Sequence, residues 1–189
     1  MSAYVVQLSG GLDSAACLLW ALEKGHKVDP VFYTYGQPYL NMEYRAARKL
    51  TDHLKLPLSI WPVDMITKDI YVPYRNLILT AHSLHIAASN KMDGVVVGSC
   101  QADIYVDGSM EFFIRLRSLI DFITEEGNVS PEIILPIHTW SKAQVVKFIV
   151  DAGYNPDELW TCYGIGPKPC GTCSHCLKYA EAKRELGMT

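Results

Sequence analysis

The sequence lacks an excess of positive charge, since its 189 residues carry 17 Lys and Arg against 20 Asp and Glu. Proteins that grip nucleic-acid phosphates usually have a clear basic excess, so direct binding to DNA or RNA is not expected. No apolar run approaches the ~20 residues of a membrane-spanning helix. The first residues also lack the basic and apolar regions of a secretory leader. These absences predict a cytoplasmic protein without a membrane segment.

Internal repeats and low-complexity stretches are absent as well. Hydrophobic residues make up 49% of the chain and charged residues 20%, which is ordinary globular composition and excludes a disordered chain, a collagen or a coiled coil. The composition changes once, after Trp160, where Gly, Pro and Cys replace the apolar periodicity. We therefore expect a main domain over residues 1–159, with residues 160–189 forming a cysteine-bearing loop and a helix of the same compact unit.

Apolar runs typical of strands alternate with amphipathic runs typical of helices. The expected strands span residues 4–8, 28–35, 58–63, 94–98 and 133–136. The expected helices span residues 13–25, 41–54, 75–90, 112–124, 141–152 and 177–186. This alternation predicts an α/β fold with a doubly wound, mainly parallel, Rossmann-like sheet. Ligands of such sheets bind beyond the carboxyl ends of the strands.

A glycine-bearing turn, Ser9-Gly10-Gly11-Leu12-Asp13-Ser14, joins the first strand to the first helix. Its glycines let backbone N–H groups approach an anion, and the helix start adds positive partial charge. The hydroxyls of Ser9 and Ser14 are further donors, and Asp13 is a candidate ligand for phosphate-bound Mg²⁺. The alternative is a plain turn in which Asp13 or Ser14 caps the helix, but the position after the first strand favours a phosphate site. The turn lacks the Gly-Lys-Ser/Thr of a Walker loop and is not a Gly-x-Gly-x-x-Gly motif.

Six cysteines are present, and Cys17 and Cys100 stand alone among apolar residues. The other four lie within fifteen residues: Cys162, Cys170, Cys173 and Cys176. Without signs of secretion, this spacing predicts a metal site rather than disulfides. Tetrahedral Zn²⁺ with a structural role is the expected occupant, an iron–sulfur cluster is the rival, and His175 is expected to be a bystander.

The motif Ser9–Ser14 resembles the signature of the PP-loop ATP pyrophosphatases, which have an adenine nucleotide alpha hydrolase type of fold. The resemblance implies that residues Leu8, Ser9, Gly10, Gly11, Leu12, Asp13 and Ser14 bind the pyrophosphate part of ATP. It also implies that adenine lies over the end of the second strand, at Phe32 and Tyr33.

Together with the cysteine cluster, this motif resembles the 7-cyano-7-deazaguanine synthases of queuosine biosynthesis. Further similarities are the segments Tyr35-Gly36-Gln37, Val72–Asn76, Ser141–Ala143 and Trp160–Tyr163. The sequence departs from the family at Tyr74, where Gly is usual. It departs again in a shortened 103–112 loop, where Ser109 replaces an expected Arg.

The resemblance implies an ATP-dependent carbon–nitrogen ligase that converts 7-carboxy-7-deazaguanine and ammonia into 7-cyano-7-deazaguanine through adenylated acid and amide intermediates. It implies small-molecule substrates, a homodimer, structural Zn²⁺, and the use of ATP and Mg²⁺. The candidate residues for substrate and catalysis are Tyr35, Gln37, Arg75, Asn76, Asp103, Asp107 and Lys142.

The candidate residues have distinct expected roles and plainer alternatives. Arg75 and Lys142 supply cations for phosphate or carboxylate, whereas Gln37, Asn76, Asp103 and Asp107 read the polar edge of the base and Tyr35 stacks. A cation at a helix start opposes the helix dipole, which favours a functional role for Arg75. Lys142 alternatively faces solvent, and the two aspartates alternatively form loop turns.

Other functions remain open at this stage. They are a PP-loop ligase acting on tRNA, on a related deazapurine or on a protein terminus, and a catalytically idle nucleotide-binding homologue. A tRNA-modifying ligase needs a basic surface, against which the acidic balance counts. An intact Ser9–Ser14 motif argues for working ATP chemistry.

Overall fold

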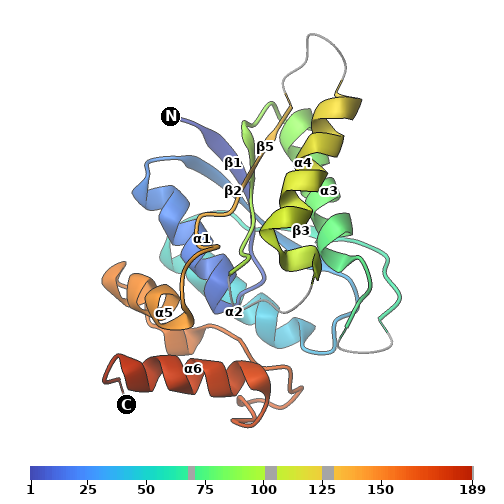
Figure 1. Cartoon of the computed structure of the whole chain (residues 1–189). Helices are drawn as coiled ribbons and strands as arrows, with labels where there is room; N and C mark the ends of the chain where they lie inside the picture. The colour runs from blue at the N-terminus through green and yellow to red at the C-terminus, as the bar shows by residue number, and fades with distance from the viewer. Residues whose placement is uncertain (68–70, 101–105, 125–129, 189) are drawn as a thin grey trace.

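A five-stranded parallel sheet forms the centre of the computed structural model, which describes residues 1–67, 71–100, 106–124 and 130–188 (Figure 1). The strands stand in the order β3-β2-β1-β4-β5 and every neighbouring pair is parallel. Their bounds are Ala3–Gln7 for β1, Lys27–Thr34 for β2, Ser59–Pro62 for β3, Gly94–Val96 for β4 and Glu132–Ile134 for β5. The order reverses direction between β1 and β4, so the expected doubly wound α/β fold is confirmed.

Helices cover both faces of the sheet and connect its parallel strands. Their bounds are Leu12–Glu23 for α1, Leu40–His53 for α2, Arg75–Ser89 for α3, Met110–Ile123 for α4, Lys142–Asp151 for α5 and Ser174–Glu185 for α6. One hydrophobic cluster joins one face of β1 to α1, α2, α5 and α6. The other joins the opposite face to α3 and α4.

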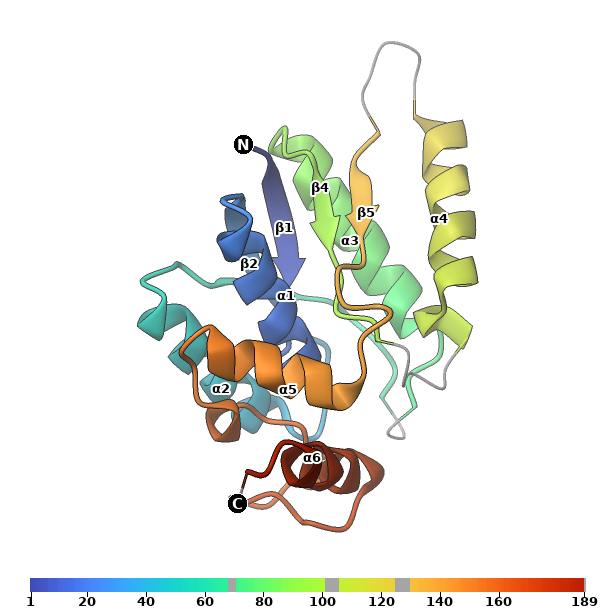
Figure 2. The same cartoon turned by 60° about the vertical axis from the view of Figure 1, so that its left-hand side comes forward.

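The alternation of side chains along β1 explains why the core has two parts. Val6 belongs to the cluster on the α1 side, and Val5 belongs to the cluster on the α3 side. Both are fully buried, as expected for a central strand of a parallel sheet. Helix α6 packs on α5 at the end of the molecule toward which the strands point (Figure 2).

The starts of two helices differ from the sequence expectation by two or three residues. Helix α4 begins at Met110, two residues before the expected start, since the Ser109 side chain accepts a hydrogen bond from the Phe112 N–H at 3.2 Å. Helix α6 begins at Ser174, so Cys176 lies in its first turn and not before it. Among the described residues, two short 3-10 turns, Val106–Gly108 and Pro156–Glu158, were not expected.

None of the helices in the described ranges is long and apolar enough to cross a membrane.

Candidate active site

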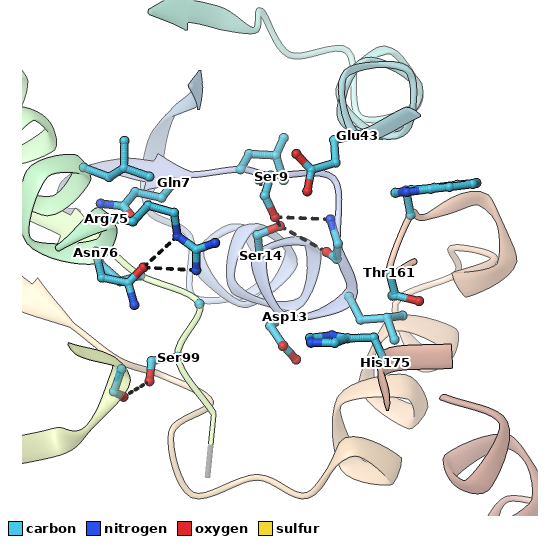
Figure 3. Close-up of a pocket in the computed structure, with 18 of the residues that line it drawn as sticks. Gln7, Ser9, Asp13, Ser14, Glu43, Arg75, Asn76, Ser99, Thr161 and His175 are labelled. Carbon is cyan, nitrogen blue, oxygen red and sulfur yellow. Dashed lines mark hydrogen bonds between the residues drawn. The ribbon is translucent and has the colours of Figure 1, made fainter. Parts of the chain in front are cut away.

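A cavity of about 480 Å³ lies at the carboxyl ends of β1, β2 and β4 (Figure 3). Its walls come from the β1–α1 turn, the end of β2, helix α2 and the start of α3. The segment after β4, the start of α5, the segment 160–163 and the start of α6 complete them. The cavity therefore lies where the order of the strands reverses, the position at which open parallel sheets bind ligands.

The β1–α1 turn has a fixed shape and leaves the start of α1 available to an anion. The Ser14 hydroxyl donates to the Gly11 carbonyl at 3.0 Å and accepts from the Ser9 N–H at 3.1 Å. Gly11 is the N-cap residue; it has no side chain to accept from the first-turn N–H groups, and its own N–H donates to Ser9 Oγ at 3.4 Å. The alternative in which Asp13 or Ser14 merely caps the helix is therefore wrong, and N–H groups of the first turn point at the cavity unpaired by a cap.

Gly10 brings the turn into direct backbone contact with α2. Its φ is +83°, and a Cβ at this position would lie 2.3 Å from the carbonyl oxygen of Glu43. On the other side of the turn, a Cβ at Gly98 would lie 2.9 Å from the Ser14 backbone nitrogen. Helix α2 and the segment after β4 therefore pack closely against the turn, and the contacts leave room only for glycine at positions 10 and 98.

Asp13 and Lys142 form an ion pair at the floor of the cavity. The Lys142 Nζ donates to the two carboxylate oxygens of Asp13 at 2.5 and 2.7 Å. Both side chains are largely buried, with exposed fractions of 16% for Lys142 and 24% for Asp13. The sequence alternative of a solvent-facing Lys142 is therefore wrong. The Lys142 side chain reaches back from the first residue of α5 to the first turn of α1.

The end of β2 borders the cavity beside the glycine-bearing turn. The Phe32 ring packs against Tyr44 of α2 with centroids 5.6 Å apart. The Tyr33 side chain points to the opposite face of the sheet, where its hydroxyl lies 2.7 Å from Ser83 Oγ and 3.2 Å from His82 Nδ1. Both side chains are buried, so an adenine over this strand end would meet mostly backbone.

Gln37 forms a turn after β2 with both ends of its amide. Its Oε1 accepts from the Tyr35 N–H at 2.9 Å, and its Nε2 donates to the Tyr33 carbonyl at 3.0 Å and to Glu43 Oε2 at 3.3 Å. Gln37 lines the cavity but is only 5% exposed. Its polar atoms hold the chain in place, which leaves little of the amide for a base edge.

Arg75 enters the cavity from the start of α3 and is oriented by its neighbour. Asn76 Oδ1 accepts from Arg75 Nε and Nη2 at 3.4 Å each. Asn76 is itself fixed, because its Nδ2 donates to the Asp107 carbonyl at 3.0 Å and its N–H donates to an Asp107 carboxylate oxygen at 3.3 Å. Asp107 therefore stands behind Asn76 instead of lining the cavity.

The charge of Arg75 is supported by tyrosine hydroxyls. Burial opposes this charge, but Tyr35 and Tyr39 more than compensate and raise the pKa of Arg75. Burial in turn raises the pKa of Tyr35. The guanidinium is a permanent cation of the cavity wall, suited to a phosphate or a carboxylate.

Tyr74, which precedes α3, adopts the left-handed conformation with φ 58° and ψ 17°. This conformation is the one that glycine adopts freely and a side chain disfavours. It explains why a Gly at this position, as in the resembled family, fits the same turn.

Glu43 is a cavity residue that the sequence analysis did not identify. It comes from the first turn of α2, and its carboxylate points into the cavity (Figure 3). Burial raises the pKa of Glu43 to about 7, although the Gln37 hydrogen bond and the Arg75 charge act in the opposite direction. Its only sequence signal is a carboxylate on the face of α2 that also carries the buried Ala46 and Ala47.

Four cysteine sulfurs converge beside the cavity. The Sγ atoms of Cys162, Cys170, Cys173 and Cys176 all lie within 4.8 Å of one another. The Cys162 Sγ accepts from the Gly164 and Cys170 N–H groups at 3.1 and 3.2 Å, and the Cys170 Sγ accepts from the Cys173 N–H at 3.3 Å. The predicted four-cysteine metal site is therefore confirmed in its donor set, and His175 is not among these ligands.

These sulfurs fit a single tetrahedral ion. An ion ~2.3 Å from each sulfur places the sulfurs ~3.8 Å apart, and the Cys170 and Cys176 Sγ atoms are 4.0 Å apart. An iron–sulfur cluster would need its cysteines spread around a larger core. Hydrogen bonds, foremost from the Thr172 backbone, lower the pKa of Cys170 to about 5, which favours the thiolate that a metal requires.

The cysteine site is part of the cavity wall. Cys162 lines the cavity together with Thr161 and Tyr163, and the Trp160 N–H donates to the Gly10 carbonyl at 2.9 Å. The indole Nε1 of Trp160 is buried without a hydrogen-bond partner among the described residues. Residues 160–163 therefore connect the glycine-bearing turn directly to the first of the four cysteines.

Most of the predicted site residues meet in this cavity. Those that line it are Leu8, Ser9, Gly11, Leu12, Asp13, Ser14, Phe32, Tyr33, Tyr35, Gln37, Arg75, Asn76 and Lys142. Gly10 and Asp107 support lining residues from behind. Asp103 lies outside the described residues. His175, Lys178 and Ser99 line the cavity without having been singled out for it. Ser99 directly follows an expected strand, which was a usable signal, whereas nothing in the sequence places the start of α6 there.

Comparison with protein families gives a match along nearly the whole chain. The family described as queuosine biosynthesis protein QueC matches residues 3–69 and 64–187. A 7-cyano-7-deazaguanine synthase of Parasynechococcus marenigrum is 30% identical, with 97% of this chain and 93% of that protein covered. A synthase of the same name from Synechococcus sp. (strain CC9902) is 29% identical over 97% of this chain and 93% of its own length.

Solved structures share the fold at low sequence identity. A U34-tRNA thiolase of Methanococcus maripaludis with its [4Fe-4S] cluster gives a TM-score of 0.58 at 16% identity, covering 98% of this chain and 66% of that one. A 4-thiouridine synthetase in complex with RNA and ATP gives 0.57 at 17% identity, covering 98% of this chain and 50% of that one. At this identity the likeness concerns the fold alone.

Proposed function

The chain belongs to the family of the queuosine biosynthesis protein QueC, and from this premise we propose that it is an ATP-dependent ligase that makes 7-cyano-7-deazaguanine from 7-carboxy-7-deazaguanine and ammonia. The observation that carries the proposal is the convergence of three features in one cavity. They are the uncapped start of α1, the Asp13–Lys142 pair and the Arg75 guanidinium. A cytoplasmic location and a homodimer, expected from the resemblance, belong to the same proposal.

The proposed reaction solves the problem that a carboxylate oxygen is a poor leaving group. The substrate carboxylate attacks the α-phosphorus of ATP, pyrophosphate departs, and ammonia then displaces AMP to give the amide and a proton. The amide oxygen repeats the attack on a second ATP. The amide oxygen then leaves as part of AMP while the amide nitrogen loses its two protons, and the product is the nitrile. Both cycles demand positioning and charge stabilisation more than acid–base chemistry.

The cavity residues have roles that follow from their placement. The N–H groups at the start of α1 and the Ser9 hydroxyl would bind the pyrophosphate part of ATP. The Ser14 hydroxyl donates to the Gly11 carbonyl and would hold the shape of the turn. Lys142, held by Asp13, adds a positive charge beside them. Arg75 is placed to receive the substrate carboxylate or the α-phosphate.

Two metals complete the proposal. A structural Zn²⁺ fits the four cysteine sulfurs and has no open coordination position for catalysis. Mg²⁺ would neutralise the departing pyrophosphate. Asp13 is its candidate ligand, because a carboxylate retains acceptor capacity beyond its two bonds to Lys142.

Turnover tests the reaction directly. The purified protein is supplied with ATP, Mg²⁺ and ammonium, with or without 7-carboxy-7-deazaguanine, and AMP, pyrophosphate and product mass are measured. AMP and pyrophosphate should form in equal amounts and only with the acid present, and the product should have the mass of the nitrile. Formation of AMP without dependence on the acid would contradict the proposal.

Lys142→Ala tests the role of the buried ion pair. The variant should lower kcat/KM by about a hundredfold, the effect typical of a lost charge-stabilising group. Lys147→Ala is the matched control on the same helix, because Lys147 is 61% exposed and forms its ion pair with Asp151 at the surface. Equal activity of the two variants would show that the Lys142 charge does not contribute to the reaction.

A further inference from the structure

The Glu43 carboxylate is an acceptor group in the cavity that no role described so far uses. Its Oε2 accepts one long hydrogen bond, from Gln37 Nε2 at 3.3 Å. Among the described residues no hydrogen bond is recorded to its Oε1. Both oxygens belong to a side chain that lines the cavity and points into it (Figure 3). A carboxylate in such a position needs donors, which a ligand can bring.

The residues expected from the sequence to read the base edge are engaged elsewhere or lie outside the described residues. The Gln37 amide is bound at both ends to its own turn and to Glu43. The Asn76 side chain bridges Arg75 and Asp107. Of the carboxylates that line the cavity, Asp13 is held by Lys142. Asp13 is also the candidate Mg²⁺ ligand, so Glu43 is the described cavity carboxylate to which no role has yet been assigned.

Glu43 and Arg75 place an acidic hydrogen-bond acceptor and a cationic donor on two walls of the cavity. Glu43 comes from α2 and Arg75 from the start of α3, and both side chains line the same space. A 7-carboxy-7-deazaguanine molecule has matching poles, because its ring carries N1–H and a 2-amino group on one edge and its carboxylate on the other. An acidic acceptor facing two adjacent donors makes strong, charge-assisted hydrogen bonds.

We propose that Glu43 is the specificity-determining residue that binds the N1–H and 2-amino edge of the deazaguanine ring. The inference rests on the proposed function and deepens it by naming how the base is chosen. An ionised carboxylate only accepts hydrogen bonds, so it suits this two-donor edge. It disfavours adenine, whose amino group stands beside an acceptor nitrogen.

Direct binding of two ligands tests the inference without turnover. The dissociation constants of 7-carboxy-7-deazaguanine and of its analogue lacking the 2-amino group are measured by calorimetry, for the wild type and for Glu43→Gln. The wild type should bind the 2-amino ligand about ten- to a hundredfold more tightly than the analogue. In Glu43→Gln this ratio should fall close to one, while ATP binding changes by less than about twofold.

Two further variants serve as controls for the effect of Glu43→Gln. Asp52→Asn removes an exposed carboxylate of the same helix that pairs with Arg48, and should leave both dissociation constants unchanged. Glu43→Asp keeps the charge and should retain part of the discrimination even where Glu43→Gln fails to fold.

The possible results separate the inference from the proposed function. If Glu43→Gln weakens both ligands equally, Glu43 only holds the Gln37 turn, and the inference is wrong while the proposed function stands. If the ratio persists in Glu43→Gln, another group reads the base edge and the inference is again wrong. If the wild type binds neither ligand yet forms AMP with another acceptor, both the inference and the proposed substrate are wrong.

Discussion

Two single residues, Glu43 and Tyr74, lie in environments that are energetically unfavourable for their side chains. Glu43 is a carboxyl group whose pKa is raised by partial burial, and Tyr74 is a side chain in a left-handed conformation. Glutamine at the first position and glycine at the second would remove each penalty. Residues that lower stability in this way concentrate at binding sites, and both lie at or next to the cavity.

The stability of the protein should fall with rising pH through the titration of Glu43. Its pKa is raised from 4.5 to about 7 in the folded state, so between these values the unfolded state has lost the proton that the folded state retains. The folded state binds more protons in this window, and the free energy of unfolding therefore decreases as pH rises from 4.5 to 7. The full effect is about 3 kcal/mol.

Chemical denaturation of the wild type and Glu43→Gln at several pH values measures this contribution. The difference between the two stabilities should grow in favour of Glu43→Gln as pH rises to about 7 and stay constant above it. Arg75 and the neighbouring tyrosines do not titrate in this window, so they contribute equally to both proteins. A difference independent of pH would show that the folded Glu43 titrates normally.

Tyr74→Gly should stabilise the protein by up to about 1 kcal/mol. A side chain at φ 58° is strained by about 1–2 kcal/mol, and the greater freedom of glycine in the unfolded chain offsets part of the gain. The Tyr74 side chain is 70% exposed, so little packing is lost. Thermal melting measures the effect, and Tyr74→Ala, which retains the strained conformation, should not show it.

How far single residues could be predicted depended on whether their partners were close in the sequence. The Ser9–Ser14 turn and the four cysteines are local patterns, so their grouping was predictable. The opposition of Arg75 to its helix dipole singled it out, and the structure has it lining the cavity, while its role stays a prediction. Glu43 was not predictable, because only the packing of α2 against Gly10 turns this face of the helix toward the cavity.

At the scale of elements, the start of α1 depends on the helix that packs on it. Helix α2 touches the Gly10 backbone, and the segment after β4 touches Ser14 through Gly98. The type and order of the helices and strands were predictable from apolar periodicity. Their ends were less so, because caps such as Ser109 and the short 3-10 turns depend on local hydrogen bonds.

Gly10→Ala should destabilise the protein and weaken ATP binding together. The added Cβ would lie 2.3 Å from the Glu43 carbonyl oxygen, so either the turn or α2 must move. Gly25→Ala is the matched control, since Gly25 has a similar φ of +74° and an added Cβ there would meet no described atom within 4 Å beyond its chain neighbours. Denaturation should show a larger loss for Gly10→Ala than the strain of about 1 kcal/mol shared by both. Equal losses would contradict the close packing.

At the scale of the whole molecule, the cavity joins parts of the chain that are far apart in sequence. The turn after β1 meets residues 160–163 and the start of α6. This meeting was not predictable from residue patterns, because a cysteine loop shows its metal ligands but not its neighbours. The metal site therefore holds a wall of the cavity as well as the start of a helix.

Removal of the metal should weaken ATP binding and loosen residues 160–185. Without the ion the four thiolates repel one another and the loop loses its constraint. Hydrogen exchange and ATP titration before and after chelation measure both effects, and Zn²⁺ should restore them. Elemental analysis should find one zinc per chain, whereas iron with visible sulfide-to-iron absorption would contradict the assignment.

The hydrogen bond between Trp160 and Gly10 has a consequence for biosynthesis of the protein. The glycine turn is translated long before the wall that closes over it. A ribosome-bound nascent chain that already has its sheet thus cannot present the complete cavity. The cavity is completed late in synthesis, after the cysteine segment has emerged from the exit tunnel.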